Sequence, residues 1–519
     1  MKKKSRKILM IVMAVAFGSI MVGSSTVALF GGFGSLKNTA QTSDTTITGT
    51  PADNYKDKDR PIFCGTGDAK SNKYVTEFKI PTVCTQPLAI TTDPSGNVWF
   101  TESNTGKLVK FDPFSRFFTE YENSKWPKGD KSMMWGIGYA SDGNIWFTDD
   151  AHDVVWKFSV AQQNYTTFKY PISEVGEALP QRLLIEGKKI LVNDFTGNKI
   201  TFFDSEQTGQ EIRYSKLQFP TNDTATASMA LDPDGKVWYT VWKYQQGGHL
   251  VRYDPKNSNG TGFKLPLGIL APNGISVGPD GKIWITDAAS SLFFSFDPES
   301  QKYAKFITTV PRELTYGNSS GLIKTPISRP YWNHFDQKGR LWFNEQTSNS
   351  IAVFDPIKES LVEYLVPSQN PNWSDCSGLS TCGIAQVLDF TINEDKIWFT
   401  EWVENNIGLL DSSIALPIDV SVEPSEAILE RGSDATLSFT ITPKEKLDES
   451  VSLTAATTAG PHDLDISGGN QKVTVVDQPQ TLSVKVSADK FALSGTYKVV
   501  IGARYHEVTL SKFVTITIK

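Results

Sequence analysis

The chain has 519 residues and a formal net charge of −6, with acidic and basic residues interspersed along its length. A chain of this size forms about two to four domains, and the interspersed charges exclude an extended nucleic-acid-binding surface. The 13 Trp, 16 Tyr and 30 Phe residues favour β-structure, because aromatic side chains suit the half-buried surface of a sheet. No pattern calls for an organic cofactor.

The first 30 residues form a targeting segment. A basic stub, MKKKSRK, precedes an uncharged apolar run over residues 8–30, which is long enough to cross a bilayer as a helix. We expect a signal-anchor helix or a cleaved signal peptide over residues 1–30. The anchor is favoured because no small-residue cleavage site ends the run. Either way the remainder lies outside the cytoplasm, anchored to the membrane or secreted. Residues 31–60 are polar and Gly/Ser/Thr-rich, and we expect a flexible linker there.

The four cysteines are candidates for disulfides. An even number in an exported chain suggests a disulfide framework. Cys64 with Cys84 and Cys376 with Cys382 are the simplest pairings, although four cysteines allow three connectivities.

A motif centred on tryptophan recurs between residues 61 and 415. Copies read GNVWFTESN (96–104), GKIWITDAA (281–289) and GRLWFNEQT (339–347). Seven copies are anchored on one aromatic or aliphatic position: Trp99, Trp146, Leu191, Trp238, Trp284, Trp342 and Trp398. Each copy contains four short strand-like segments, which is typical of a β-propeller blade. We therefore expect a seven-bladed β-propeller over residues 61–415, in which residues 74–81 supply the outer strand of the last blade and remove its open edge.

A different pattern follows the last copy. From residue 416 to residue 519, apolar and polar residues alternate with period two in about seven segments separated by turn residues. This pattern predicts an Ig-like or fibronectin-like β-sandwich.

Acidic residues stand three positions after the anchor in six of the seven copies. They are Glu102, Asp149, Asp194, Asp287, Glu345 and Glu401, and Val241 is the exception. In a propeller these positions form a ring around the axis. On one interpretation each acid accepts hydrogen bonds in its own turn. On the other, some of them, above all Glu401, Glu345 and Glu102, bind Mg²⁺ or Ca²⁺, which prefer carboxylate oxygens.

Aromatic residues gather in or beside the longer loops. The segments before the sixth and seventh copies are long, and long loops on a rigid scaffold often carry binding residues. Five aromatic side chains are candidates for contact with a ligand: Trp332, Tyr331, Trp402, Trp373 and Trp135.

The repeat resembles the streptogramin (virginiamycin B) lyase family. The segment DKIWFTEWVENNIGLL (395–410) carries the resemblance most clearly, and the similarity extends over about residues 74–411. The resemblance implies a seven-bladed propeller that opens a cyclic depsipeptide by Mg²⁺-assisted elimination. Glu401 matches a metal-binding Glu of the family. Val387 stands where the family has its catalytic His, and Tyr331 stands where it has a second His. His334, three residues further on, or a carboxylate of the ring is then the candidate base.

Three functions are consistent with these features. The first is a surface-exposed binding protein for a glycan, a peptide or a cell-surface protein, with no catalytic activity. The second is a metal-dependent carbon–oxygen lyase or a lactonase-type hydrolase, which needs a general base such as His. The third is a structural component of the cell envelope. We favour the binding protein, because neither family His is present at its matching position.

Overall fold

The computed structural model describes residues 64–519 except 66, 128, 172–177, 197–198, 207–214, 218, 220–224, 244–245, 258, 318–325, 375, 377–378 and 380–381. Strands form almost all of its regular structure, together with the short helix α3 (Glu313–Tyr316) and the 3-10 turn η3 (Pro371–Trp373). The fold is all-β, as the composition predicts. The expected N-terminal helix over residues 1–30 and the linker over residues 31–60 lie outside the described residues. No helix among the described residues is both long and apolar enough to cross a membrane.

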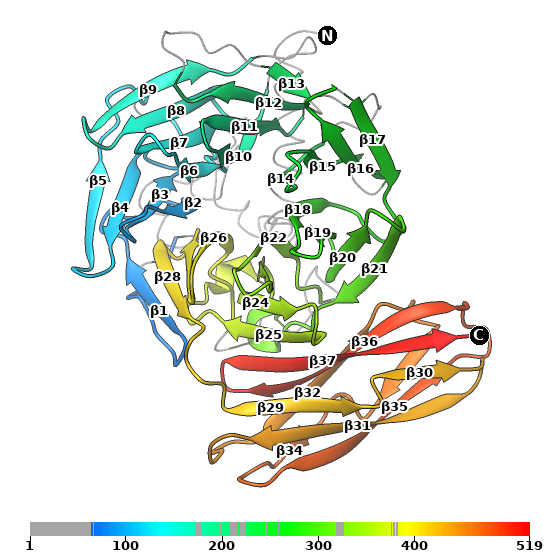
Figure 1. Ribbon diagram of the computed structural model, residues 1–519. Coiled ribbons are helices and arrows are strands. Elements are labelled where there is room, and N and C mark those ends of the chain that lie inside the picture. The colour runs from blue at the N-terminus through cyan, green and yellow to red at the C-terminus, as the bar shows by residue number, and fades with distance from the viewer. Residues whose placement is uncertain are drawn as a thin grey trace, which may run out of the picture.

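Seven four-stranded antiparallel units follow one another around a ring (Figure 1). We name them S1 to S7 and list each from its innermost strand outwards. S1 is β2 (Pro87–Thr92), β3 (Val98–Glu102), β4 (Leu108–Asp112) and β5 (Phe117–Tyr121). S2 is β6 (Ile137–Tyr139), β7 (Asn144–Asp149), β8 (Val154–Ser159) and β9 (Asn164–Lys169). S3 is β10 (Pro180–Glu186), β11 (Lys189–Asp194), β12 (Lys199–Asp204) and β13 (Ser215–Leu217). S4 is β14 (Met229–Leu231), β15 (Val237–Lys243), β16 (Gly247–Asp254) and β17 (Asn259–Lys264).

The remaining units complete the ring. S5 is β18 (Pro272–Val277), β19 (Ile283–Asp287), β20 (Leu292–Asp297) and β21 (Lys302–Ile307). S6 is β22 (Pro330–Phe335), β23 (Leu341–Glu345), β24 (Ser350–Asp355) and β25 (Ser360–Leu365). S7 is β26 (Val387–Asn393), β27 (Lys396–Glu401), β28 (Asn406–Asp411) and β1 (Val75–Lys79). The first strand of the described chain is therefore the outer strand of the last unit.

In S1, S4 and S6 the recurring tryptophan is fixed by the turn that precedes its strand. In S1 the indole nitrogen of Trp99 donates a hydrogen bond to Asp93, with 2.9 Å between Nε1 and Oδ2. The same bond forms in S4 and S6, between Trp238 and Asp232 and between Trp342 and Asp336. Gly96, between Asp93 and Trp99, has a φ of 82°, a conformation that favours glycine. The D-x-x-G-x-x-W spacing thus encodes a turn and satisfies a buried indole.

A ring of hydrogen bonds joins each unit to the next. The side chain two residues after the anchor position donates to a backbone carbonyl on or just before the inner strand of the following unit, over 2.5–3.2 Å. The pairs are Thr101–Met134, Thr148–Gln181, Asn193–Thr226, Thr240–Pro272, Thr286–Tyr331, Asn344–Val387 and Thr400–Leu88. The last pair joins S7 back to S1, so the ring of bonds is closed. Each bond satisfies a backbone group that the interior would otherwise leave unpaired.

Two disulfides crosslink the segments that precede S1 and S7, where the ring closes. Cys64 is bonded to Cys84, just before S1, and Cys376 is bonded to Cys382, just before S7. These are the two simplest pairings that the sequence offers. Disulfides persist in oxidising environments, so they indicate an extracytoplasmic location.

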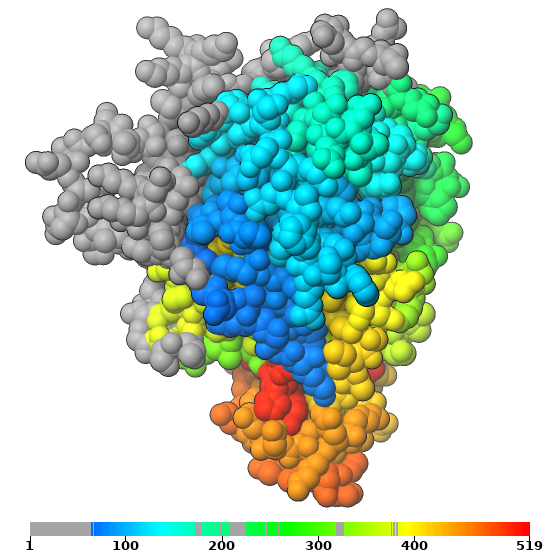
Figure 2. All heavy atoms as spheres, turned by 90° about the vertical axis from the view of Figure 1, so that its left-hand side faces the viewer, coloured from blue at the N-terminus to red at the C-terminus, as the bar shows by residue number. Residues whose placement is uncertain are grey.

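A second, smaller body follows S7 and packs against the rim of the ring. One of its sheets has the order β29 (Ile418–Glu423), β31 (Asp434–Pro443), β35 (Gln480–Ala488) and β33 (Leu464–Ser467). The other contains β37 (Val508–Ile518), β36 (Gly495–Tyr505), β32 (Val451–Thr457), β34 (Lys472–Val473) and β30 (Glu426–Leu429). We call this body the sandwich. Figure 2 shows it from the side, directly below the ring.

The sandwich continues one sheet of the ring. Strand β37 pairs antiparallel with β25, the outer strand of S6, from Ser360 opposite Lys512 to Tyr364 opposite Val508. S6 and half of the sandwich therefore form a single nine-stranded sheet. This pairing covers an edge of S6 that would otherwise be open.

Candidate functional site

An ion pair crosses the centre of the ring. Arg182, on the inner strand of S3, lies 3.0 Å from the carboxylate of Asp389, on the inner strand of S7. The neighbours of β10 are β6 and β14, so the pair spans the channel rather than joining adjacent units. The guanidinium also donates to the carbonyl of Trp135 over 3.0 Å and lies 4.6 Å from the ring centre of Trp332. These contacts tie S2, S3, S6 and S7 together across the axis.

Glycines at the position that matches Arg182 let the inner strands approach one another. In S2 a Cβ atom on Gly136 would lie 2.5 Å from the backbone oxygen of Gln181. In S5 a Cβ atom on Gly274 would lie 2.5 Å from the backbone oxygen of Tyr331. Both distances are shorter than van der Waals contact allows. Glycine at this position in S2 and S5 therefore allows close packing of neighbouring inner strands around the channel.

The five aromatic residues expected to contact a ligand are core residues. Tyr331, Trp332, Trp373, Trp402 and Trp135 are each exposed by 4% or less. The rings of Tyr331 and Trp332 are 4.4 Å apart, and Trp373 and Trp402 meet edge to face at 5.4 Å. This burial corrects the expectation of an exposed aromatic surface. Large rings bury much apolar area, so they stabilise the loops by packing inwards.

His334 is poorly placed to act as a base. It pairs across the sheet with Trp342, whereas Pro330, on the same strand, pairs with Glu345. Four residues of strand correspond to about 13 Å, so His334 lies near the opposite end of the channel from Glu345. Burial, together with the positive charge of Arg182, lowers the pKa of His334 to about 3. The half-buried His334 ring packs edge to face against Phe390 in S7.

The ring aspartates are hydrogen-bond acceptors for the loops around them. Asp287 is fully buried and accepts the backbone N–H of Ala271 over 2.6 Å and the hydroxyl of Ser290 over 2.7 Å. Asp194 accepts the backbone N–H of Leu179 over 3.0 Å. These bonds fit the first interpretation of the recurring acid, with the difference that backbone donors also come from the preceding loop.

The ring glutamates of S6 and S7 each face a second glutamate on the outer strand. Burial raises the pKa of Glu401 well above its usual range, and the neighbouring Glu77 raises it further. Asn406 donates to both carboxyl groups, over 2.8 Å to Glu401 and 3.5 Å to Glu77. Burial likewise raises the pKa of Glu345, and Glu363 adds to the shift. In both ring glutamates burial therefore disfavours the ionised form.

S1 repeats this arrangement more weakly. Burial raises the pKa of Glu102 to about 8, while a hydrogen bond from the Thr105 hydroxyl opposes the shift. The outer-strand glutamates of all three units accept a hydroxyl and a backbone N–H from the unit before them. These donors are Thr82 for Glu120, Thr309 for Glu363 and Ser368 for Glu77. The outer-strand glutamates thus latch neighbouring units together.

The predicted metal ligands do not converge. Glu102, Glu345 and Glu401 belong to three different units. Among the residues that the structure describes, no three His, Cys, Asp or Glu side chains are placed to hold one ion. Mg²⁺ and Ca²⁺ take ionised or carbonyl oxygens, and burial raises the pKa of Glu345 and Glu401, which disfavours their ionised form. The described residues do not fit either cation.

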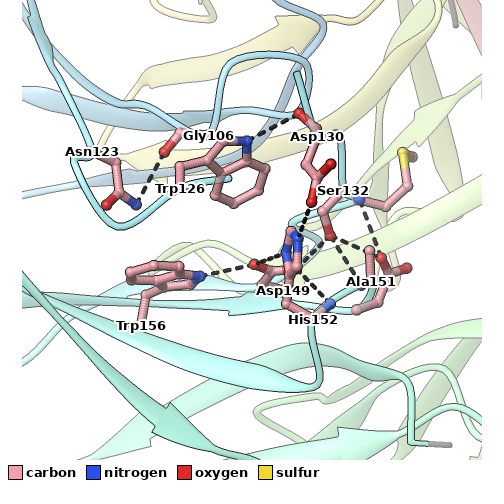
Figure 3. Close-up of polar contacts among 11 residues, drawn as sticks. Gly106, Asn123, Trp126, Asp130, Ser132, Asp149, Ala151, His152 and Trp156 are labelled. Carbon is pink, nitrogen blue, oxygen red and sulfur yellow. Dashed lines mark hydrogen bonds and ion pairs between the residues drawn. The ribbon is translucent and has the colours of Figure 1, made fainter. Parts of the chain in front are cut away.

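A partly accessible polar cluster lies where S1 meets S2 (Figure 3). Asp149 closes β7, and its Oδ2 lies 2.8 Å from Nδ1 of His152 and accepts the indole N–H of Trp156 over 2.9 Å. On the other side, Nε2 of His152 lies 3.2 Å from Oδ2 of Asp130, in the loop that leads into S2. The hydroxyl of Ser132 donates to Asp149 over 2.5 Å. His152 therefore lies between two carboxylates, one on each of two segments.

The charge state of this cluster suits binding better than catalysis. The hydrogen bond to Asp149 raises the pKa of His152 to about 9, and Asp130 adds to the shift. The imidazole is thus protonated at neutral pH and cannot accept a proton from a substrate. The Ser132 hydroxyl bonds Asp149 rather than His152, so no activated nucleophile is formed. The side chains of His152 and Asp130 are 23% and 52% exposed.

An aromatic ring completes the cluster. Trp126 meets His152 edge to face, with 5.0 Å between ring centroids, and its indole N–H donates to the carbonyl of Asp130. Trp126 is half-buried, so part of its ring faces solvent. We call Trp126, Asp130 and His152 the S1–S2 cluster. It lies on the face that carries the loops entering each unit and the turns after each second strand, which we call the loop face.

Sequence patterns missed the S1–S2 cluster and the channel ion pair. Asp149 is found by the repeat, but Asp130 and Trp126 lie in a loop that has no equivalent in the other copies. A weak signal for the channel pair exists. Arg182 and Asp389 are charged residues on inner strands whose other copies carry Ala, Gly, Ser or Trp at that position.

Comparison with known proteins agrees with the fold. The model of the virginiamycin B lyase family matches residues 65–293. Selenomethionine-substituted virginiamycin B lyase from Staphylococcus aureus superimposes with a TM-score of 0.51 at 19% identity, covering 66% of this chain and 99% of that one. The propeller is virginiamycin B lyase-like. A catalytically inactive variant of that enzyme with quinupristin gives a TM-score of 0.52 at 19% identity, covering 66% of this chain and 99% of the other. A streptogramin B lyase gives 0.50 at 21% identity, covering 65% and 97%. No curated protein matches the chain.

The lyase-like propeller differs from the family pattern where the resemblance implies a base. Val387 and Tyr331, which stand at the two family His positions, are both fully buried. The backbone carbonyl of Val387 accepts the Asn344 amide, and that of Tyr331 accepts the Thr286 hydroxyl. Both positions therefore serve the closed ring of hydrogen bonds.

Proposed function

We propose that the chain is an extracytoplasmic binding protein that holds a glycan or a peptide on the loop face of its propeller. The S1–S2 cluster supplies the contacts: the Trp126 ring stacks on an apolar face of the ligand, and Asp130 and His152 bind its polar groups. The observation that supports this location is the partial exposure of all three side chains, in contrast with the five buried aromatic residues Trp332, Tyr331, Trp402, Trp373 and Trp135.

The proposal extends to the domain organisation. We take S1 to S7 as the seven blades of one propeller over residues 61–415, and residues 416–519 as an Ig-like domain. The chain is then anchored to the membrane by residues 1–30, or secreted after their removal. An anchored propeller with an attached sandwich suits recognition of envelope glycans, peptides or surface proteins. The two disulfides are in keeping with that setting.

The catalytic alternative is a metal-dependent lyase acting on a cyclic depsipeptide, or a lactonase-type hydrolase. Elimination needs a base near neutral pKa. Val387 and Tyr331 cannot supply one, and the pKa of His334 is far below that range. Burial raises the pKa of the ring glutamates Glu345 and Glu401, which lie on different units. These features favour binding without elimination.

The test is a turnover assay with quinupristin and Mg²⁺, followed by mass spectrometry. Elimination leaves the mass of the depsipeptide unchanged, so the linear product is detected by its altered retention and fragmentation. We expect the wild type and Glu401→Gln to leave quinupristin cyclic to the same extent as buffer alone. A linear product formed by the wild type and lost in Glu401→Gln would overturn the proposal in favour of the lyase.

A further inference from the structure

Two arginines, one from the ring and one from the sandwich, each donate hydrogen bonds across the junction between these two bodies. Arg312, in the loop that leads from S5 to S6, donates to the backbone carbonyls of His506 and Val508 in the β36–β37 hairpin of the sandwich. In return Arg504, on β36, donates to the backbone carbonyl of Val310 in that same loop. Each guanidinium binds backbone of the other body, so the contact fixes the path of both segments.

Arg504 also serves a buried carboxyl group of the ring. Burial raises the pKa of Glu363, and the positive charges of Arg504 and Arg312 oppose that rise. The hydroxyl of Thr309 bonds the Glu363 carboxylate over 2.7 Å and lies 3.5 Å from the Arg504 guanidinium. The sandwich thus supplies counter-charge to the outer strand of S6. A buried charge that loses its partner is strongly destabilising.

The loop between S5 and S6, which these arginines contact, forms hydrogen bonds with the loop between S6 and S7 on the same face. Helix α3 begins directly after Arg312. The backbone N–H of Gly383 donates to the carbonyl of Leu314 over 3.1 Å, and the Ser374 hydroxyl donates to the carbonyl of Tyr316 over 2.8 Å. Tyr316 is 2% exposed, so it packs into the molecule. A continuous set of contacts therefore runs from the β36–β37 hairpin through α3 to the segment of the Cys376–Cys382 disulfide.

We propose that the sandwich is a positioning domain for the loop face: its β36–β37 hairpin and Arg504 hold residues 309–316, and through them Ser374 and Gly383. An ion pair elsewhere at the junction provides a control for these arginine contacts. Lys498 of β36 lies 2.6 Å from Glu359, which directly precedes β25. Glu359 is at one end of the β25–β37 ladder, and Val508 is at the other, so this pair stabilises the same interface without touching the loops. This positioning is independent of any ligand at the S1–S2 cluster.

Hydrogen exchange of the full chain, read by mass spectrometry, tests the proposal with Arg312→Met and the matched control Lys498→Met. The reporter amides are those of Tyr316, Gly317 and Gly383, which donate within or onto α3. We expect Arg312→Met to speed their exchange by about tenfold or more, because local opening is governed by local contacts. Lys498→Met should leave them at the wild-type rate.

A more conservative substitution of Arg312 controls for the possibility that Arg312→Met fails to fold. Arg312→Gln retains one donor and should give an intermediate rate at the same amides. Wild-type exchange in Arg312→Gln and Arg312→Met would overturn the proposal. So would equal acceleration by Arg312→Met and Lys498→Met, because that result would mean that any weakening of the interface loosens the loops.

Discussion

Arg182 and Asp389 form an ion pair of 3.0 Å between two units that are not neighbours around the ring. Both side chains are largely buried, at 13% and 3% exposure. The pair therefore joins opposite sides of the channel. Because the pair occupies the channel interior, we look for a ligand site among the loops around the channel mouth.

Removing one partner of this pair should destabilise the propeller strongly. Arg182→Met leaves the carboxylate of Asp389 buried without its counter-charge, so we expect a loss of about 3–5 kcal/mol in the free energy of unfolding. The double variant Arg182→Met/Asp389→Leu should recover most of that loss, because it removes both charges. Urea denaturation of the single and double variants measures this coupling. Additive losses in the double variant would show that the two groups do not interact.

The hydrogen bond that closes the ring should contribute measurably. Thr400→Val removes the donor to the carbonyl of Leu88 and leaves that carbonyl buried. We expect a cost of about 1–3 kcal/mol. Thr166→Val is the matched control, because Thr166 is an exposed threonine on the outer strand β9. Its effect should stay within about 0.5 kcal/mol. If both variants lower the free energy of unfolding equally in chemical denaturation, the Thr400–Leu88 hydrogen bond does not contribute specifically to stability.

The closed ring shows what the repeat could and could not predict. The spacing of Asp93, Gly96, Trp99 and Thr101 encodes a turn, a buried indole and a contact to the next unit, all of which are local or one unit away. Such short-range rules leave a clear sequence pattern. The disulfides could also be anticipated, because neighbouring cysteines in an exported chain pair most simply.

The features that escaped prediction depend on distant segments. Arg182 meets Asp389 only because seven units close into a ring, which places residues more than 200 positions apart at the same axis. The pairing of β37 with β25 likewise depends on where the sandwich docks. Aromatic residues in long loops serve both binding and packing, and sequence does not distinguish the two, so the pattern predicts ligand contact for Trp332 and Trp373. Their burial is decided by the loops that fold over them.

Stability should fall as the pH rises through the neutral range. The folded-state pKa of Glu102 is about 8, above the usual value for glutamate, so the folded state favours the protonated form. Its contribution is complete below about pH 4.3 and is lost as the pH rises through about 8. Glu345 and Glu401 are shifted in the same direction. Glu102→Gln should flatten this dependence in urea titrations at several pH values. A slope identical to that of the wild type would contradict the assignment.

Divalent cations should not stabilise the protein. A ligand that binds only the folded state raises the melting temperature, but no three His, Cys, Asp or Glu side chains among the described residues converge on one point. We expect the same melting temperature in Mg²⁺, in Ca²⁺ and in EDTA, for the wild type and for Glu401→Gln. A cation-dependent rise in the wild type that disappears in Glu401→Gln would place a metal at the ring glutamates.

The most direct test of the proposed binding function is retention on an array of cell-envelope glycans and peptides. The variants are Trp126→Ala and Asp130→Asn in the S1–S2 cluster. The control is Phe114→Ala, which removes a fully exposed aromatic ring from the turn between β4 and β5, at the opposite face of S1. We predict retention of the wild type and of Phe114→Ala, with a loss of about tenfold or more in the two cluster variants. Undiminished retention of both cluster variants, or no retention of the wild type, would contradict binding at this face.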